Sequence, residues 1–526
     1  MIVRSAYPEL SIPDQSLADF VLGRAAGRGE KPALVDGPTG RTITYAGLAD
    51  DVHRMAGGLA RHGVSQGDVV ALFAPNMPEW AIAFYGIASI GATVTTINSL
   101  ATGEEIDRQL RDSGARFLIT VPPFLDRAAE PARAAGVREV FVFGEADGAT
   151  AVASLLAEDA EPPRVTISPS DLVVLPYSSG TTGFAKGVML SHRNLVANVL
   201  QTGVGQDVGE DETLVAILPF FHIYGMSVIL NLGLSRGATI VTLPKFELES
   251  FLEVMARRHV TRAFLVPPIV LALAKHPSVD GYDLSALRLI MSGAAPLDAS
   301  LANACAGRLG CVVMQGYGLT ETSPVTVITS DRPGMARAGS IGTLVPNTEA
   351  MIVDVATAEE LGPDADGEIC FRGPQVMQGY LRNPEATART IDGDGWLHTG
   401  DIGHVAADGY FFIVDRLKEL IKYKGYQVPP AELEAILLSH PAVADAAVIP
   451  VPDEEAGEIP KAFVVLADPT FDAQTLMPYV AEHVAPYKRI RRVEVIDAIP
   501  KSASGKILRR VLVERERAAL AVGPGA

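Results

Sequence analysis

The chain has 526 residues, of which 48% are hydrophobic and 20% are charged, and this composition excludes a disordered protein or a highly charged coiled coil. At about 150 residues per domain, the length predicts two to four domains. Lys and Arg number 44 against 62 Asp and Glu, so the net charge is −18. That charge argues against sequence-independent binding to nucleic acid, and we expect no nucleic-acid partner.

The chain contains only three cysteines, Cys305, Cys311 and Cys370. They are too few and too dispersed for a disulfide framework or a four-ligand zinc site. The N-terminal segment lacks the continuous apolar core of a secretory signal. These two observations together predict a cytoplasmic protein.

One uncharged run, residues 213–235, is long enough to be considered as a membrane span. Pro219, His222, Gly225 and Asn231 interrupt it, and its first six residues are typical of a buried strand. We therefore expect no membrane span.

From the N-terminus to about residue 330, short apolar runs alternate with longer segments of helical periodicity. The segments 16–29 and 44–63 predict helices. The predicted strands are residues 68–75, 115–121, 138–143, 171–177, 238–243 and 262–268. This alternation indicates an α/β fold with largely buried sheets, built as packed subdomains.

After residue 330 the sequence becomes rich in Gly, Pro and Asp, and the shorter alternating segments 342–355 and 366–373 predict a small antiparallel, β-barrel-like module. The sequence pattern changes again near Asp415. Beyond it we predict helices over 429–440 and 472–484 and strands over 444–451 and 461–467.

We place the domain boundary at 415/416, between a large N-terminal domain and a small, mobile α+β domain, residues 416–526. The small domain contains 15 basic and 15 acidic residues, so the net charge of −18 comes entirely from residues 1–415. Within the small domain the basic residues cluster, which suits anionic ligands such as nucleotides.

The strongest local motif is SSGTTGFAKG, residues 178–187, directly after an apolar strand. Hydroxyl groups, flexible glycines and one ammonium group in such a loop suit a polyphosphate. The groups concerned belong to Ser178, Ser179, Gly180, Thr181, Thr182, Gly183 and Lys186. The spacing is not that of the Walker motif.

This loop resembles the phosphate loop of the adenylate-forming superfamily, which includes acyl-CoA synthetases, luciferases and nonribosomal adenylation domains. The further motifs QGYGLTE (315–321), GWLHTGDIG (395–403), DRLKELIKYKGYQV (415–428) and PKSASGK (500–506) follow in the order of that superfamily. The resemblance covers about residues 20–515 and is greatest to 4-coumarate CoA ligases and their bacterial relatives. Ala185 departs from the pattern, because the family usually has Pro there.

The resemblance implies two half-reactions. A carboxylic acid attacks the α-phosphate of ATP to form an acyl-adenylate and diphosphate, and the thiol of coenzyme A then displaces AMP. ATP and CoA are the implied substrates, and Mg²⁺ is the implied cofactor, bound by Glu321. Lys506 is implied as the cation of the first step, and Asp401 with Arg416 as the ribose site.

The resemblance assigns further residues by motif. The implied catalytic residues are Lys506, His222, Lys422 and Gln427. The implied nucleotide site comprises the phosphate-loop residues named above together with Ala294, Gln315, Gly316, Tyr317, Thr320, Asp401, Arg416, Lys418, Lys422, Gln427 and Lys506. The implied acyl pocket comprises Phe221, His222, Tyr224, Gly293, Gly318, Pro324 and Val325, and the implied CoA contacts are Lys245, Lys424 and Gly425.

Taken singly, these residues also fit structural roles. Lys506 fits a surface lysine, Glu321 a helix-capping residue, Asp401 a turn residue and His222 a hydrogen-bonded core histidine. Lys418 fits a solvated position better than a binding role. The motif context is what favours the functional roles.

No Asp or Glu lies within residues 213–235 to pair with a substrate ammonium, so we expect an acid without an amine. We predict a 4-coumarate-type ligase for an aryl-propenoic acid. The alternatives are a medium-chain fatty-acyl CoA ligase, acyl transfer to a carrier protein, luciferase-like oxidation and a catalytically inactive relative. The oligomeric state stays open between monomer and homodimer.

One small domain has to present Lys506 for the first half-reaction and the edge around Lys422 and Gln427 for the second. A single orientation is unsuited to both tasks, so we predict a large rotation of the small domain about a hinge at Asp415.

Overall fold

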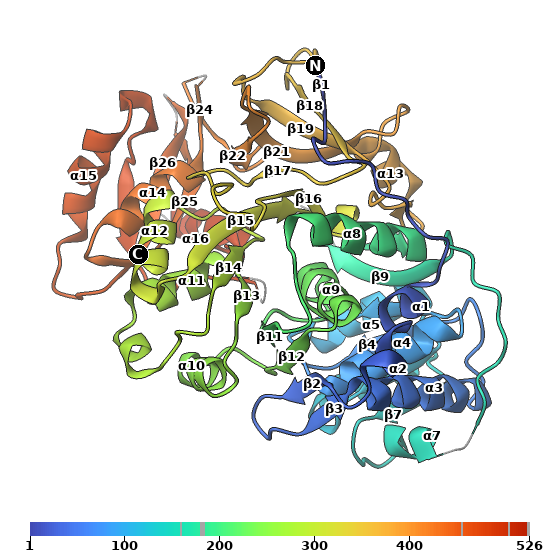
Figure 1. Ribbon diagram of the computed structural model, residues 1–526. Coiled ribbons are helices and arrows are strands. Elements are labelled where there is room, and N and C mark those ends of the chain that lie inside the picture. Colours follow the sequence, from blue (N-terminus) through green and yellow to red (C-terminus); the bar gives the residue numbers. More distant parts are fainter. Residues whose placement is uncertain (158–159, 179–184, 425, 454–455, 503–504, 523–526) are drawn as a thin grey trace.

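The computed structural model describes residues 1–526 except 158–159, 179–184, 425, 454–455, 503–504 and 523–526, and excludes the side chains of residues 427 and 519–522 (Figure 1). Two helix-covered sheets, an antiparallel sheet and a small C-terminal domain make up the molecule. The mixed α/β fold with a large N-terminal and a small C-terminal part is therefore confirmed.

The first sheet has eight strands, and its central strands run parallel. Their buried, β-branched runs are typical of strands covered on both faces. In spatial order the strands are β20 (Gly379–Tyr380), β10 (Lys186–Ser191), β9 (Leu172–Ser178), β5 (Thr93–Thr96), β4 (Val69–Phe73), β6 (Phe117–Thr120), β7 (Glu139–Val142) and β8 (Thr150–Ala151). The associated helices are α3 (Tyr45–Arg61), α4 (Pro78–Ser89), α5 (Gly103–Ser113), α6 (Leu125–Ala135), α7 (Val152–Ala157) and α8 (His192–Gly205).

The second sheet has nine strands, of which the central six are parallel. The spatial order is β17 (Thr343–Leu344), β16 (Val325–Ile328), β15 (Val312–Gly318), β14 (Leu289–Ser292), β13 (Arg262–Leu265), β11 (Thr213–Ala216), β12 (Thr239–Thr242), β2 (Pro32–Asp36) and β3 (Thr42–Thr44). Its helices are α9 (Leu232–Arg236), α10 (Leu248–Arg257), α11 (Pro267–Lys275) and α12 (Ala299–Leu309).

One continuous core joins the two sheets. Trp80 of α4 lies at its centre, with its ring centroid 5.2 Å from Phe84 and 5.5 Å from Phe220. All six strands predicted in this half of the chain are confirmed. The predicted helix over 16–29 is two helices, α1 (Leu17–Leu22) and α2 (Ala25–Arg28), because the chain turns at Gly23.

The uncharged run 213–235 is divided between three elements. Strand β11 comes first, followed by the π-helix η2 (Tyr224–Asn231) and by α9. Short π-helical segments occur frequently at functional sites, because they shift the side chains that follow. Among the described residues, no helix combines the length and the apolar character needed to cross a bilayer.

The antiparallel module predicted after residue 330 is a five-stranded sheet at the top of Figure 1, drawn in gold and orange except for the N-terminal strand, which is blue. Its strands are β1 (Ile2–Arg4), β18 (Glu349–Val353), β19 (Gly367–Arg372), β21 (Leu397–Val405) and β22 (Phe411–Arg416). The inner face packs Ile369 and Phe371 against Val327 and Leu344 of β16 and β17. The helix α13 (Pro384–Thr390) precedes β21.

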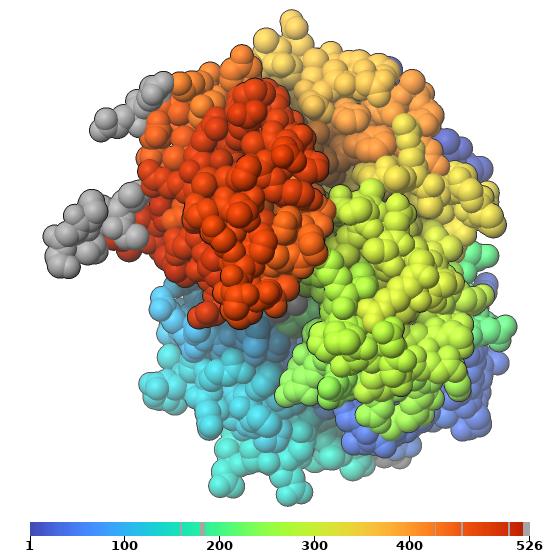
Figure 2. All heavy atoms as spheres, turned by 90° about the vertical axis from the view of Figure 1, so that its left-hand side faces the viewer, coloured from blue at the N-terminus to red at the C-terminus, as the bar shows by residue number. Residues whose placement is uncertain are grey.

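The small domain packs helices on both faces of a sheet. Its strands are β24 (Tyr426–Val428), β23 (Ile421–Tyr423), β26 (Gly457–Leu466), β25 (Val443–Asp453) and β27 (Arg492–Val495), and its helices are α14 (Pro430–Ser439), α15 (Leu476–His483) and α16 (Arg509–Val522). Figure 2 shows this domain, in red, packed against the yellow and green parts of the large domain. Lys275 Nζ donates across the boundary to the carbonyl of Leu438 at 3.0 Å.

Candidate active site

The ends of the phosphate loop are fixed by two paired strands. Ser178 is the last residue of β9 and Lys186 is the first of β10, and the register of the ladder sets them opposite each other. Ser179, Gly180, Thr181, Thr182 and Gly183 lie outside the described residues. The loop therefore starts and ends at one point, beside the carboxyl end of β9.

A hydrogen-bonded carboxylate lies at that point. Glu321, in the short helix η4 (Thr320–Thr322), accepts hydrogen bonds at Oε1 from Ser178 Oγ and from the hydroxyl of Tyr380, both at 2.8 Å. Lys186 Nζ lies 4.9 Å from the centroid of the Tyr380 ring. Two neutral donors orient Glu321 without neutralising its charge, and such a carboxylate is a chemically suitable ligand for Mg²⁺.

Tyr380 is a site residue that the sequence reasoning missed. It lies on the edge strand β20, which pairs with β10 so that Tyr380 is opposite Val188. Burial and the neighbouring Glu321 raise its pKa well above the usual value, which keeps the hydroxyl protonated as a donor. A two-residue edge strand leaves no periodic signal in the sequence, so only the fold brings this side chain to the loop.

The predicted ribose site forms at a bulge in the antiparallel sheet. Asp401 of β21 is opposite Arg416 of β22, and Arg416 Nε lies 3.3 Å from Asp401 Oδ1. The Tyr317 hydroxyl donates to the other oxygen, Oδ2. Burial raises the pKa of Asp401, and Arg416 and the Tyr317 hydroxyl oppose that rise. Each carboxylate oxygen keeps a lone pair that can accept from a ribose hydroxyl.

Lys506 lies within electrostatic reach of this carboxylate. Burial lowers the pKa of Lys506 to about 8; Arg416 lowers it as well, while Glu419 and Asp401 oppose the effect. Gly505 holds the loop close to the large domain, since a Cβ there would lie 3.0 Å from Val266 Cγ2. The small domain thus presents Lys506 to the groups of the predicted ribose site.

His222 lies within electrostatic reach of Lys506. Burial, and to a smaller extent the charge of Lys506, lower the pKa of His222 to about 4. The backbone N–H of Tyr224 donates to His222 Nδ1 at 3.2 Å. A neutral ring whose Nδ1 accepts carries its proton on Nε2, so His222 is a hydrogen-bond donor at neutral pH.

The predicted adenine shelf lies at the carboxyl ends of β14 and β15. Ala294 is exposed and adopts a left-handed backbone conformation, with φ +69°, which costs a non-glycine residue about 1–2 kcal/mol. Gln315 Oε1 accepts the backbone N–H of Leu297 at 3.0 Å and so holds the loop that carries Ala294. A Cβ added at Gly316 would make only ordinary van der Waals contacts with its neighbours.

The predicted acyl pocket contains one tightly packed aromatic ring. The Tyr224 hydroxyl donates to the carbonyl of Met291 at 3.1 Å, and a Cβ on Gly293 would lie 3.0 Å from the ring. Burial raises the pKa of Tyr224 well above its usual value. The Phe221 carbonyl accepts from Thr96 Oγ1 at 2.7 Å. Because Gly293 has no side chain, the Tyr224 ring can lie directly on the Gly293 backbone.

Gly318 has a structural explanation as well. A Cβ at this position would lie 2.0 Å from the carbonyl oxygen of Pro324, and the ladder pairs Gly318 with Val325. Only glycine fits this close approach of two backbones. The closeness of β15 and β16 thus requires this residue independently of any substrate.

Four lysines that were predicted to bind ligands lie outside the buried site. Lys418, Lys422 and Lys424 are exposed on the small domain, and the exposed Lys245 forms an ion pair with Glu247 at 2.6 Å. Gly425 and the side chain of Gln427 lie outside the described residues. The roles of all these residues stay predictions.

The predicted hinge residue caps a helix. Asp415 Oδ2 accepts the backbone N–H of Ala431 in the first turn of α14 at 2.9 Å. Burial raises the pKa of Asp415, and the charge of Arg509 opposes that rise. Arg509 makes a two-pronged ion pair with Glu434, at 2.8 and 2.6 Å, and contacts Glu419. The sequence reasoning did not single out these three residues, which form a buried ionic network beside the hinge.

Comparisons with known proteins agree with this geometry. The model of the AMP-binding enzyme family matches residues 23–381, and that of the AMP-binding enzyme C-terminal domain matches residues 432–506. Two rice (Oryza sativa subsp. japonica) proteins are similar over 99% of this chain: 4-coumarate–CoA ligase 3, 44% identical over 96% of its own length, and 4-coumarate–CoA ligase 5, 46% identical over 98%.

Among solved structures, the anthranilate CoA ligase AuaEII in complex with anthranoyl-AMP superposes with a TM-score of 0.90 at 30% identity, over 97% of this chain and 99% of that one. The agreement extends through both domains, because the superposition covers nearly the whole of each chain. The chain belongs to the AMP-binding enzyme family, and the two rice relatives that it matches over nearly its whole length are 4-coumarate–CoA ligases.

Proposed function

We propose that this chain is a 4-coumarate-type CoA ligase that activates an aryl-propenoic acid. The observation that carries the proposal is its 44–46% identity, over 99% of its length, to 4-coumarate–CoA ligases. Membership of the AMP-binding family gives the class of reaction. The chain is an AMP-forming acid–thiol ligase that uses ATP and CoA and passes through an acyl-adenylate.

In the first half-reaction, the acid carboxylate approaches an α-phosphate that is also negative. The repulsion has to be offset by preorganised cations and donors, and removing one such group typically slows a reaction by about 10²–10³-fold. We assign this role to Lys506. Its electrostatic influence on both Asp401 and His222 supports the assignment, because these two residues are the ones proposed to bind the ribose and the acid.

His222 orients the acid in this scheme. A neutral ring with its proton on Nε2 donates a hydrogen bond to a carboxylate and leaves that carboxylate nucleophilic. Protonated His222 would bind the carboxylate more strongly, but its positive charge would make the carboxylate a weaker nucleophile. The lowered pKa of His222, about 4, supports the neutral donor at physiological pH.

Asp401, oriented by Arg416 and Tyr317, binds the ribose hydroxyls, and Lys186 binds the phosphates at the end of the loop. Glu321, held by Ser178 and Tyr380, is the residue that would bind Mg²⁺, which neutralises phosphate charge when it is bound. These groups fix the nucleotide at both ends, so that its α-phosphate faces Lys506.

We assign the second half-reaction to a rotated state in which the edge around Lys422, Lys424 and Gly425 faces the adenylate, with Lys245 on the large domain as a further CoA contact. Lys422 and Lys424 are exposed in this structure, whereas Lys506 is partly buried. This difference supports two separate orientations of the small domain. Asp415 is the proposed pivot between residues 1–415 and 416–526.

The chemistry around Tyr224 supports an acid with an aromatic or apolar body. Tyr224 lies on Gly293, Val325 is buried in the core of the large domain, and residues 213–235 carry no formal charge. A buried ammonium without a carboxylate partner would be strongly disfavoured, so amino acids are poor substrates in this scheme. AuaEII, an anthranilate CoA ligase, is a relative whose acid is aromatic.

A substrate panel tests the proposal. Purified chain, ATP, Mg²⁺ and CoA are incubated with 4-coumaric, cinnamic, hexanoic and octanoic acids at matched concentrations, and acyl-CoA and AMP are quantified. We expect kcat/KM to be at least tenfold higher for the two aryl-propenoic acids. Higher values for the fatty acids would assign the chain to medium-chain acids, and adenylate formed without CoA transfer would favour a carrier-protein acceptor.

We further propose that the enzyme works in the cytoplasm. All three cysteines are free and buried, which supports a reducing compartment. Separation of cell fractions with an antibody against the chain tests this location.

A further inference from the structure

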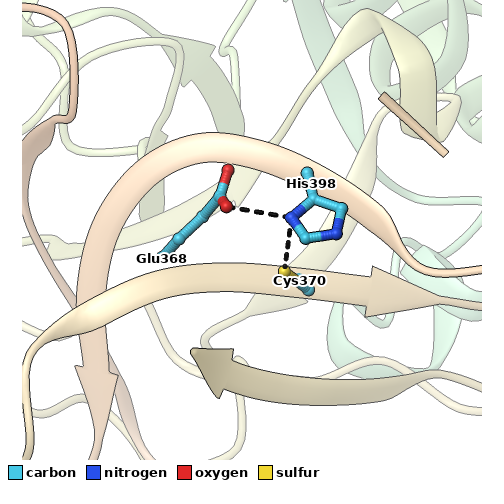
Figure 3. Close-up of side chains that lie close together, drawn as sticks. All are labelled: Glu368, Cys370 and His398. Atoms are coloured by element: carbon cyan, nitrogen blue, oxygen red, sulfur yellow. Dashed lines mark hydrogen bonds and ion pairs between the residues drawn. The ribbon is translucent and has the colours of Figure 1, made fainter. Parts of the chain in front are cut away.

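Three potential metal ligands lie together on the outer face of the antiparallel sheet, and none of them is assigned to the proposed reaction (Figure 3). Glu368 and Cys370 belong to β19, and His398 belongs to β21. His398 Nδ1 lies 2.9 Å from Glu368 Oε2 and 3.4 Å from Cys370 Sγ. One atom from each residue, a carboxylate oxygen, a thiol sulfur and an imidazole nitrogen, lies within 4.8 Å of the other two.

The sheet itself creates this group. Residues alternate along β19, so Ile369 and Phe371 face the inner core while Glu368 and Cys370 face outward. Cys370 is directly opposite His398, and the register shifts between Cys370 and Glu368. Such a bulge re-aims side chains, and here it directs the Glu368 carboxylate toward the cross-strand Cys–His pair.

Two hydrogen bonds orient the carboxylates around the histidine. Glu368 Oε1 accepts the backbone N–H of Gly400 at 2.8 Å, which leaves Oε2 directed at His398. Asp392 Oδ1 accepts the backbone N–H of Trp396 at 2.9 Å, and Asp392 Oδ2 lies 3.6 Å from His398 Nε2. An imidazole with one nitrogen toward a thiol and a carboxylate, and the other toward a second carboxylate, matches the usual arrangement of a metal-bound histidine.

The surroundings of the sulfur are apolar. Cys370 is fully buried and packs with Met351, Val353 and Trp396. A hydrophobic shell of this kind excludes water from metal–sulfur bonds. The other side of the group is open, since the side chain of His398 is 31% exposed and that of Asp392 is 34% exposed. A cation can therefore approach from the histidine side.

The donor set selects the cation. One sulfur, one nitrogen and one oxygen ligand suit Zn²⁺ and similar borderline-soft divalent ions, whereas Mg²⁺ prefers oxygen alone. Tetrahedral zinc with bonds of about 2.0–2.3 Å separates its ligand atoms by roughly 3.4–3.6 Å. The Nδ1–Sγ distance of 3.4 Å already fits, and the Nδ1–Oε2 distance of 2.9 Å has to open by about 0.5 Å.

We propose that Glu368, Cys370 and His398 form a binding site for a divalent cation of the Zn²⁺ class, with Asp392 as the positioning residue for His398 and a fourth coordination position open. On binding, the Cys370 thiol releases its proton to solvent and its sulfur bonds to the cation. The imidazole keeps one proton, on Nε2, and donates it to Asp392, while the Nδ1 lone pair bonds to the cation. No oxidation or reduction is involved.

The competing account is an imidazolium ion at His398 paired with Glu368 and Asp392, with Cys370 merely packed beneath it. That account predicts no metal affinity, and it gives the thiol no special role.

Co²⁺ distinguishes the two accounts, because its bond to a thiolate gives an intense near-ultraviolet charge-transfer absorption. The full-length chain, freed of metal and kept in Mg²⁺ buffer, is titrated with Co²⁺ and then with Zn²⁺. We expect one Co²⁺ per chain, with an absorption that Zn²⁺ abolishes. C370S and, on the partly exposed side, H398Q should lose the absorption, and D392N should weaken Co²⁺ binding by about 10–100-fold while keeping it.

The chain supplies its own control. Cys305 and Cys311 are the other two free thiols, and both are buried. The double variant C305S/C311S should keep the absorption at full intensity. Absence of the absorption in the parent chain, its persistence in folded C370S or H398Q, or its loss in C305S/C311S would each overturn the proposal. Circular dichroism establishes that every variant compared is folded.

Discussion

The charge of Lys506 is the most sensitive single feature of the proposed site. An unperturbed lysine has a pKa near 10.5, and burial together with Arg416 lowers that of Lys506 to about 8. The protein thus holds a cation that is ready for a phosphate but is close to losing its proton. Bound ATP, being negative, should raise this pKa again.

This lowered pKa gives a prediction for the pH dependence. The kcat/KM for ATP reports groups of the free enzyme, so in adenylate formation it should fall about tenfold per pH unit above pH 8, as Lys506 loses its proton. The kcat profile should bend at a higher pH, because the nucleotide favours the protonated amine. Initial rates of diphosphate release between pH 6.5 and 10 measure both profiles.

Lys506→Arg is the matched control, since a guanidinium stays charged throughout this range. Its kcat/KM, at a lower absolute level, should stay flat up to pH 10. An equal fall in the parent and in Lys506→Arg would assign the titration to another group.

At this scale the proposed site residues come from motifs, and a residue that stands in no motif escapes prediction. Motifs indicate Lys506, Asp401, Arg416 and His222, and in the structure Lys506 lies within electrostatic reach of the other three. Tyr380 was missed because its hydrogen bond to Glu321 connects residues from separate elements. A close approach of this kind depends on the pairing of β20 with β10, which no local pattern records.

Among the elements, strands β15 and β16 constrain the proposed acyl pocket most tightly. Gly318→Ala would set a Cβ 2.0 Å from the Pro324 carbonyl oxygen, and the obstacle is backbone, which cannot rotate away. We expect a loss of stability of about 1–3 kcal/mol or more. The midpoint of thermal unfolding, measured at one scan rate, should fall by several degrees.

Gly307→Ala in α12 is the control, because nothing lies within 4 Å of its Cβ position. It should keep or slightly raise the midpoint, as expected when alanine replaces glycine inside a helix. If Gly318→Ala were as stable as the parent and changed only the preference among acids, Gly318 would be a pocket residue and not a packing requirement.

The elements themselves were largely predictable, for reasons of burial. Runs such as 115–121 and 171–177 are rich in apolar and β-branched residues because both faces of each strand are covered. The apolar run in the sequence therefore marks the position of the strand. The π-helix over Tyr224–Asn231 was not predicted, because every residue in it is buried and the sequence shows no polar face to set a period. The break between α1 and α2 and the start of α15 depend on local turns.

For the whole molecule, the orientation of the small domain decides which half-reaction the chain is prepared for. Lys506 lies with the proposed nucleotide groups, Gly505 lies against Val266, and Lys275 binds the end of α14. Lys422 and Lys424 are exposed in this state. The boundary at 415/416 stays a prediction, since no sequence pattern reveals a rotation and the structure holds one orientation.

A restrained hinge should therefore separate the half-reactions. Asp415→Pro restricts the backbone at the proposed pivot in the state that presents Lys506, and we expect it to keep adenylate formation within a few-fold. Thioester formation from synthetic acyl-AMP and CoA should fall by at least 100-fold. Asp415→Ala, which removes the hydrogen bond to Ala431 without restricting the backbone, is the control and should keep both reactions. Equal losses in both half-reactions by folded Asp415→Pro would count against a hinge.

The most direct test of the central claim is Lys506→Ala assayed in the two half-reactions separately. Acid-dependent exchange of diphosphate into ATP measures adenylate formation, and conversion of synthetic acyl-AMP with CoA measures thioester formation. The account predicts that the exchange falls by about 10²–10³-fold while thioester formation stays within a few-fold of the parent. Loss of both reactions to the same extent, in a variant that is folded, would contradict it.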